Sequence, residues 1–457
     1  MKRIRALLIC CLALVPTSTS AFWIGGTSPF DVSSFSFEFR RRRRWRSGDD
    51  CSNLNNRITT LQAYSLTTSL EWLYDQRLEE EEEDGDENHP IYKNFQWIDV
   101  QRQQQPSAFD SDNSQAHTWE VPLYPLPAVH LPVTDQEGFY HYLNNVEPRN
   151  IQMTIDLMEI PDPADRLFCV VLSATDTGKV ANIGTLLRLV DIDPHESPDE
   201  PGKYVRVRVA CQTEGLVRIS NIVNPQAAAQ EQRIRRSSEY LCAQIQPILP
   251  SESSNCSLLE DSSLQYIIAQ IVDDYKTIKL MYQLGIWSHK LPPNAMESLA
   301  SGMPDWTVSH ELFGTEALLW TRIQEWQAVC YTIREGQQSI LAADRNELLV
   351  EAASAMGGPL KLPIHPEDVR PEDRKRLEKL ELQAQEDYWD LGLDPVLDFQ
   401  VLLSLQDVGE RLQFFSKMIK RERSRMEIVA KFGGKREEKK DDDLEPPKGA
   451  WFDDDLW

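Results

Sequence analysis

The sequence predicts an α+β fold in which a small, half-open β-barrel is followed by an α-helical lobe. Between Trp119 and Pro225, apolar residues recur mainly at every second position, which is typical of strands with one buried face. After Pro225 the spacing changes to three and four residues, which is typical of amphipathic helices. With 457 residues and 41% hydrophobic content, the chain can bury the core that such a fold needs.

The first residues predict a secretory signal peptide over residues 1–21. A basic start, Met1 to Arg5, precedes ten apolar residues and a small-residue stretch that ends at Ala21. Ten apolar residues are too few to span a bilayer, so we expect no transmembrane segment in the mature chain. Cleavage is expected between Ala21 and Phe22.

Residues 22–48 are Ser-rich and poor in acids, and they end in an arginine-rich run from Arg40 to Arg46. A signal peptide with an alanine–phenylalanine junction and a basic segment behind it resembles the two-part plastid presequence of diatoms and related algae. The resemblance implies a plastid location. The alternative is a secreted or endoplasmic-reticulum protein, which the sequon Asn255-Cys-Ser257 would fit.

The charge of the chain argues against a nucleic-acid partner. The formal net charge is −24, and residues 1–48 hold nine Lys/Arg but only two Asp/Glu, which leaves 39 basic and 70 acidic residues beyond them. Such an acidic body repels phosphate backbones, whereas non-specific nucleic-acid binding needs clustered cations.

Residues 49–116 are expected to be mostly disordered. A short amphipathic helix is predicted over 58–78, and the next nine residues, 79–87, hold eight carboxylates. Like charges at this density favour an extended segment and lack the spacing of a calcium loop. The Gln-rich stretch 101–115 is typical of a linker.

The barrel domain is predicted to cover residues 117–225. Its clearest strand has Val205, Val207 and Val209 alternating with charged or small residues, so one face is apolar. We expect a hairpin loop over 194–202, because it is rich in Pro, Asp and Gly, and a short helix over 151–158.

The helical lobe is predicted to cover residues 226–433, including an insert over about 255–357 whose purpose the sequence does not indicate. One apolar stripe comprises Ile267, Ile268, Ile271, Val272, Tyr275, Ile278 and Met281, and another comprises Leu318, Leu319, Ile323, Trp326, Val329 and Ile333. Further helices are expected over 341–355, 374–391 and 396–432, with prolines between several of them. The acidic tail, 434–457, is expected to be disordered, and its aromatic end could alternatively dock a partner.

Several motifs follow one another in an order that resembles the N-terminal, substrate-binding domain of Lon proteases. The motifs are Val121–Pro127, Val146–Met158, Phe168–Leu172, Gly184–Arg188, Gly202–Val209 and, near the C-terminus, Phe399–Leu412. The resemblance implies that the barrel has a PUA-like fold. Two positions depart from the family pattern, since Asn150 and Ile219 stand where aromatic residues are usual.

The sequence shows no ATPase or peptidase motif, although the full Lon protease carries both activities. The segment 177–180 has a glycine and a lysine but no Ser or Thr after the lysine, so it predicts a turn between strands. His310 lacks the second histidine of a zinc-protease helix, and it is interpreted as the start of a helix capped by Ser309. Asp273 and Asp274 are interpreted as the solvated side of a helix.

The eight cysteines include no Cys-x-x-Cys pair, so the sequence predicts reduced thiols and no zinc site, with Cys169 and Cys211 in the core. We therefore expect no cofactor, no metal and no enzymatic activity.

The resemblance implies a non-catalytic module that binds unfolded or exposed apolar segments of client proteins as an adaptor, holdase or proteolysis recruiter. Its partners would be protein clients, or a protease or adaptor partner. Four apolar residues next to prolines are candidate peptide contacts, with a core role as the alternative: Tyr124, Leu126, Val129 and Leu131. Two other classes stay open, an organellar enzyme with an unrecognised site and an assembly protein that docks one fixed partner.

Overall fold

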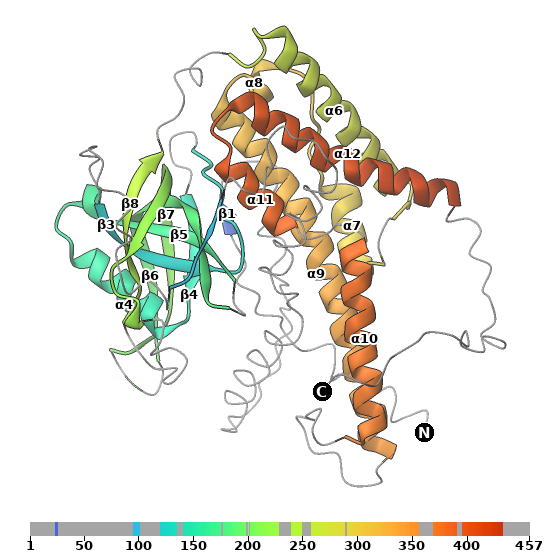
Figure 1. The fold of residues 1–457 in the computed structure, drawn as a ribbon, viewed down its shortest axis with the longest axis horizontal. Helices are drawn as coiled ribbons and strands as arrows, with labels where there is room; N and C mark the ends of the chain where they lie inside the picture. The colour runs from blue at the N-terminus through green and yellow to red at the C-terminus, as the bar shows by residue number, and fades with distance from the viewer. Residues whose placement is uncertain are drawn as a thin grey trace, which may run out of the picture.

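The computed structural model describes residues 23–25, 95–100, 119–134, 140–174, 177–197, 200, 202–227, 239–248, 257–287, 290–355, 369–390 and 395–432. A β-barrel and a helical lobe lie side by side (Figure 1). Most of the expected presequence, the acidic run 79–87 and the tail 434–457 lie outside the described residues.

In the described residues, eight strands form one mixed sheet. They are β1 (Trp23–Gly25), β2 (Trp97–Ile98), β3 (Trp119–Leu126), β4 (Tyr140–Asn145), β5 (Leu167–Ala174), β6 (Lys179–Glu196), β7 (Tyr204–Ile222) and β8 (Cys242–Ile248). Their order is β1-β4-β7-β8-β3-β5-β6-β2, and β6 also pairs with β7. Among these described strands, β3 and β5 form the only parallel pair.

The pairing of β6 with β7 closes a barrel of β3, β5, β6, β7 and β8, where the sequence predicts a half-open one. The barrel closes because β6 and β7 are long. With 18 and 19 residues, β6 and β7 pair with each other and still reach β5 and β8 on their other sides. Gly184 of β6 is required where β5 comes close, because a Cβ there would lie 2.6 Å from the Val170 carbonyl oxygen.

The expected domain boundaries need correction at both ends of the barrel. β8 lies beyond the boundary at 225, yet it pairs with β3 and β7 and buries Ala243 and Ile245 completely. At the other end, β2 pairs with β6, and Phe95 and Val100 are buried although they fall within 49–116. Both segments are too short for their alternation to stand out in the sequence.

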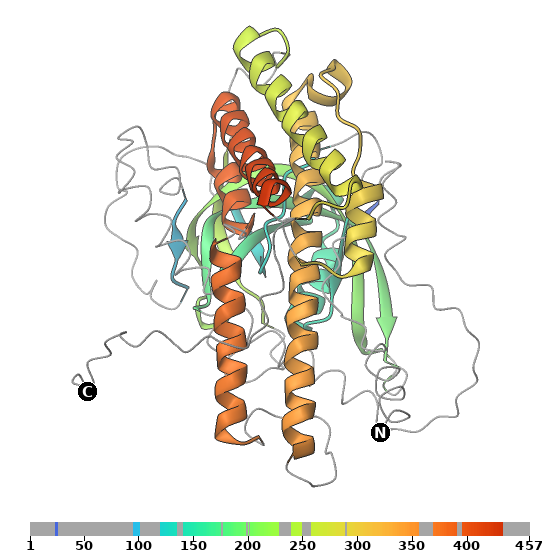
Figure 2. The same cartoon turned by 90° about the vertical axis from the view of Figure 1, so that its right-hand side faces the viewer.

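The helices are α4 (Pro148–Glu159), α6 (Ser262–Gln283), α7 (Pro293–Gly302), α8 (His310–Phe313), α9 (Glu316–Ala355), α10 (Pro371–Asp390), α11 (Pro395–Ser404) and α12 (Val408–Phe432), with a 3-10 turn at Pro163–Asp165. Figure 2 shows the lower halves of α9 and α10 side by side, projecting beyond the rest of the lobe. None of the helices in the described part of the chain is long and apolar enough to cross a membrane.

Two helix boundaries differ from the sequence prediction. α9 is one helix of 40 residues, because buried Gly336 does not break it: a Cβ there would lie 2.9 Å from Leu291 Cδ2, so the glycine admits the segment before α7. The predicted helix 396–432 is divided into α11 and α12, because Asp407 Oδ1 accepts a hydrogen bond of 2.9 Å from the Glu410 amide and caps a new helix.

The barrel and the helical lobe share one hydrophobic core. It runs from Leu123 and Ile183 in the barrel to Trp306 and Phe415 in the lobe, while a second cluster packs α4 against the barrel. Two buried glutamines connect the lobes: Gln327 Nε2 donates to the Val129 carbonyl and Gln400 Nε2 to the Ile183 carbonyl, each over 3.0 Å. The barrel therefore holds α9 and α11 in fixed positions.

Candidate binding surfaces

The predicted peptide-contact segment lies in the core. Tyr124, Leu126, Val129 and Leu131 are all buried, none of them more than 8% exposed. β3 pairs with β5 on one side and β8 on the other, and Tyr124 packs edge-to-face on Phe168 at 6.3 Å between ring centroids. Burial raises the pKa of Tyr124. The contact prediction is therefore wrong for these four side chains, and the core alternative describes them.

A stripe of exposed residues runs along the outer side of α6, and we call it the outer stripe. It comprises Tyr266, Gln270, Asp273, Thr277 and Leu280 of α6 and Leu284 directly after the helix, spaced alternately by four and three residues. Thr277 is half-buried, and the other five are exposed. Tyr266 is 65% exposed, Leu280 55% and Leu284 67%. The other side of α6 buries Ile268, Ile271 and Tyr275. The helix thus presents apolar side chains both to the core and to solvent.

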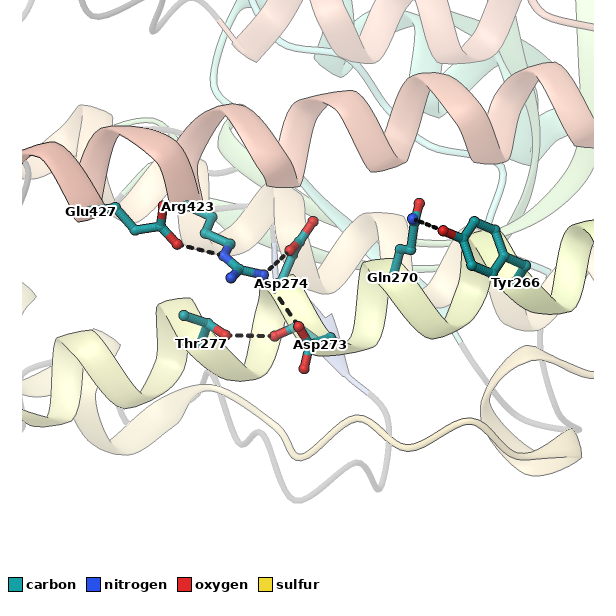
Figure 3. Close-up of polar contacts among 7 residues, drawn as sticks. All are labelled: Tyr266, Gln270, Asp273, Asp274, Thr277, Arg423 and Glu427. Atoms are coloured by element: carbon teal, nitrogen blue, oxygen red, sulfur yellow. Dashed lines mark hydrogen bonds and ion pairs between the residues drawn. The ribbon is translucent and has the colours of Figure 1, made fainter.

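Arg423 of α12 fixes the middle of the outer stripe (Figure 3). Its Nη1 donates to Asp274 Oδ1 at 2.5 Å and to Asp273 Oδ2 at 3.2 Å, and its Nε donates to Glu427 Oε1 at 2.8 Å. The bonds to Glu427 and Asp274 raise the pKa of Arg423. The interpretation of Asp274 as solvated is wrong, because α12 covers it and leaves it 8% exposed, whereas Asp273 is exposed as predicted.

Two hydrogen bonds order the remaining polar residues of the outer stripe. Gln270 Nε2 donates to the Tyr266 hydroxyl at 2.8 Å, and Thr277 Oγ1 donates to the Asp273 carbonyl at 2.9 Å (Figure 3). The stripe therefore has a polar centre between apolar ends, on a helix that an ion-pair network holds against α12.

The barrel has an incompletely covered edge at β4. β4 pairs with β7 along its inner side, and on its outer side β1 pairs only with Tyr140, His141 and Tyr142. Within the described ranges, no strand pairs with the outer side of Leu143–Asn145. Val146 and Val205, next to this end of β4 and β7, are exposed. This edge can accept a further length of extended chain.

The motifs that resemble catalytic ones have structural roles. Residues 177–178 form the β5–β6 turn, where Gly178 has a φ of 71°. His310 begins the short helix α8, with Ser309 at the cap position but without a side-chain capping bond. Among the described ranges, no three His, Cys, Asp or Glu side chains gather where they could hold a metal ion. Cys169 and Cys211 are buried free thiols, as predicted, and burial raises the pKa of each.

Solved structures to which the chain is similar include two Lon N-terminal domains. The Lon N-terminal domain protein from Xanthomonas campestris is 18% identical with a TM-score of 0.21, over 30% of this chain and 63% of that one. This chain thus spans less than two thirds of that structure. The N-terminal domain of the Mycobacterium avium complex Lon protease is 9% identical with a TM-score of 0.26, over 66% of this chain and 98% of that one. No family model matches the chain, and neither does any curated protein.

Proposed function

We propose that this protein is a non-catalytic binding module that recognises unfolded or exposed apolar segments of client proteins. Its role would be that of an adaptor, a holdase or a recruiter for proteolysis. The observation that carries the proposal is the outer stripe, where three large apolar side chains are more than half exposed. Tyr266 and Leu280 lie on α6, whose other side is already in the core, and Leu284 follows the helix directly. Exposed apolar clusters with polar surroundings typically mark protein interaction sites.

The spacing of the outer stripe indicates the shape of the client segment. Steps of four and three residues place side chains along one seam of a helix, which is how helices meet in coiled coils and in helix–groove complexes. Tyr266 would contact one end of a bound segment, and Leu280 and Leu284 would contact the other.

Charge adds a preference for basic clients. The exposed carboxylate of Asp273 lies at the centre of the outer stripe, and the chain as a whole has a net charge of −24. A client segment with a Lys or Arg between apolar residues would therefore match the stripe, and the acidic field would speed its encounter. The sequence resemblance to Lon substrate-binding domains supports the same class of function.

The proposal is tested by removing the apolar end of the outer stripe. We expect Leu280→Ser combined with Leu284→Ser to weaken binding of a reduced, carboxymethylated model protein about tenfold or more, which corresponds to about 1.4 kcal/mol of lost apolar contact. Gln283→Ser, an exposed polar change at the same helix end, is the matched control and should bind normally. Titration calorimetry and suppression of aggregation measure the effect.

Two results would contradict the proposal. One is a chain with native stability that does not bind the unfolded protein at all. The other is equal binding by the double variant and by the control, since the outer stripe would then not be the contact surface.

A further inference from the structure

The outer edge of β4 already holds a strand from a distant part of the chain. Trp23–Gly25 pair antiparallel with Tyr140–Tyr142, in the register Trp23↔Tyr142, Ile24↔His141 and Gly25↔Tyr140. These residues come directly after the expected cleavage position between Ala21 and Phe22. The outer edge of β4 therefore has room for an added strand.

The added strand covers only half of its acceptor. β4 has six residues and β1 has three, so the ladder stops at Tyr142 and leaves Leu143–Asn145 without a described strand partner on that side. On its other side, β4 is firmly held, because His141 to Asn145 pair in continuous register with β7 and Leu143 is buried. β4 is thus held in place by β7, while β1 covers only three of its six residues.

We propose that β4 is a strand-acceptor site, that Trp23–Gly25 act as its intramolecular plug, and that an extended apolar segment of a client replaces the plug. This inference rests on the proposed function only for the class of the occupant, an unfolded client protein, because β4 would take an extended segment of the client and the outer stripe a helical one. A client segment of six or more residues would pair with all of Tyr140–Asn145, so it would form a longer ladder than the plug does.

The surroundings indicate which segment fits. Val146 follows β4 directly, and Val205 precedes the part of β7 that pairs with Asn145 through Val207. Both valines are exposed, so an arriving strand would find apolar contact at the end that the plug does not reach. A segment that alternates β-branched and polar residues suits such an edge, because its apolar residues fall on one face.

The test uses the full chain and a fluorescent seven-residue peptide of alternating valine and threonine. Ile24→Pro removes a backbone donor from the plug and disfavours strand pairing. Hydrogen exchange at Tyr140–Tyr142 should become faster in this variant. The peptide should bind about fivefold more tightly by fluorescence anisotropy, because apparent affinity scales with the fraction of molecules whose edge is free. Asp31→Pro, in the same segment but outside β1, is the control and should change neither quantity.

A second variant acts on the acceptor itself. Val146→Lys places a charge at an exposed position beside the open end, so it should weaken the peptide without unfolding the barrel. Bound peptide should also slow exchange at Leu143–Asn145. The inference is overturned if Ile24→Pro leaves exchange at Tyr140–Tyr142 unchanged, or if the peptide protects residues other than β4. The exchange measurement on the plug needs no client, so its failure is distinct from a failure of the proposed function.

Discussion

Val207 lies near the start of β7, in the part of this strand that comes before its pairing with β8. It is fully buried, and its backbone pairs with Asn145 of β4 on one side and with Pro194 of β6 on the other. Its neighbour Arg206 is exposed. The two adjacent positions therefore differ in burial while sharing a strand and a register.

This difference in burial predicts that substitution by aspartate has very different effects on stability at the two positions. Val207→Asp would bury a carboxylate without a partner, at a cost on the order of several kcal/mol, against a total stability of about 5–15 kcal/mol for a domain. Arg206→Asp should change stability by less than about 0.5 kcal/mol. Thermal melting and limited proteolysis of the full chain compare the two variants. Similar melting temperatures would mean that the register of β7 is wrong by one residue.

The junction of α11 and α12 depends on Arg411. This buried guanidinium donates to Glu316 Oε1 and to the Leu405 carbonyl at 2.5 Å each, and it lies over the Trp320 ring at 4.5 Å. Burial lowers the pKa of Arg411, and the ion pair with Glu316 opposes this shift. One side chain thus connects the end of α11, the start of α12 and the first turns of α9.

We expect Arg411→Met to destabilise the helical lobe by about 3–5 kcal/mol, because it leaves Glu316 as an uncompensated carboxylate beside the core. Arg411→Lys should restore little of this loss, since an ammonium group cannot reproduce the planar fork that reaches several acceptors at once. Urea unfolding followed by far-ultraviolet circular dichroism measures both. Arg423→Lys, at a partly exposed ion pair, is the comparison and should cost much less.

Sequence patterns correctly predicted which face of a helix or strand is buried where a regular period is present. They failed where the structure depends on pairing between segments that lie apart in the sequence. The buried stripe of α6 and the buried positions 207 and 209 follow from period alone, whereas Val205 is exposed because it lies next to the loop that joins β6 to β7. β8 was missed because its seven residues are too few for their alternation to stand out, and its pairing with β3 joins segments more than a hundred residues apart. The outer stripe of α6 escaped detection because polar residues occupy its centre, although its alternating spacing was visible.

At the scale of the whole molecule, the presequence and the barrel edge are linked. The proposed plug, Trp23–Gly25, belongs to residues 22–48, which the sequence assigns to a transit-like segment. If plastid import removes that segment, the precursor carries a covered β4 and the imported protein carries an open one. A client would then bind the imported protein without displacing the plug, whereas it would have to displace the plug on the precursor.

The location is tested with residues 1–48 fused to a fluorescent reporter in a diatom. We expect the fusion to reach the plastid, and we expect Phe22→Ala to leave it outside, because the resemblance to algal presequences depends on the aromatic residue after Ala21. Trp23→Ala, a neighbouring aromatic change beyond the junction, is the matched control and should still be imported. A reporter that is secreted with or without Phe22 would establish the secretory alternative. In that case residues 23–25 would stay attached to the mature protein, β1 would remain on β4, and displacement by a longer client strand would be the only way to open the edge.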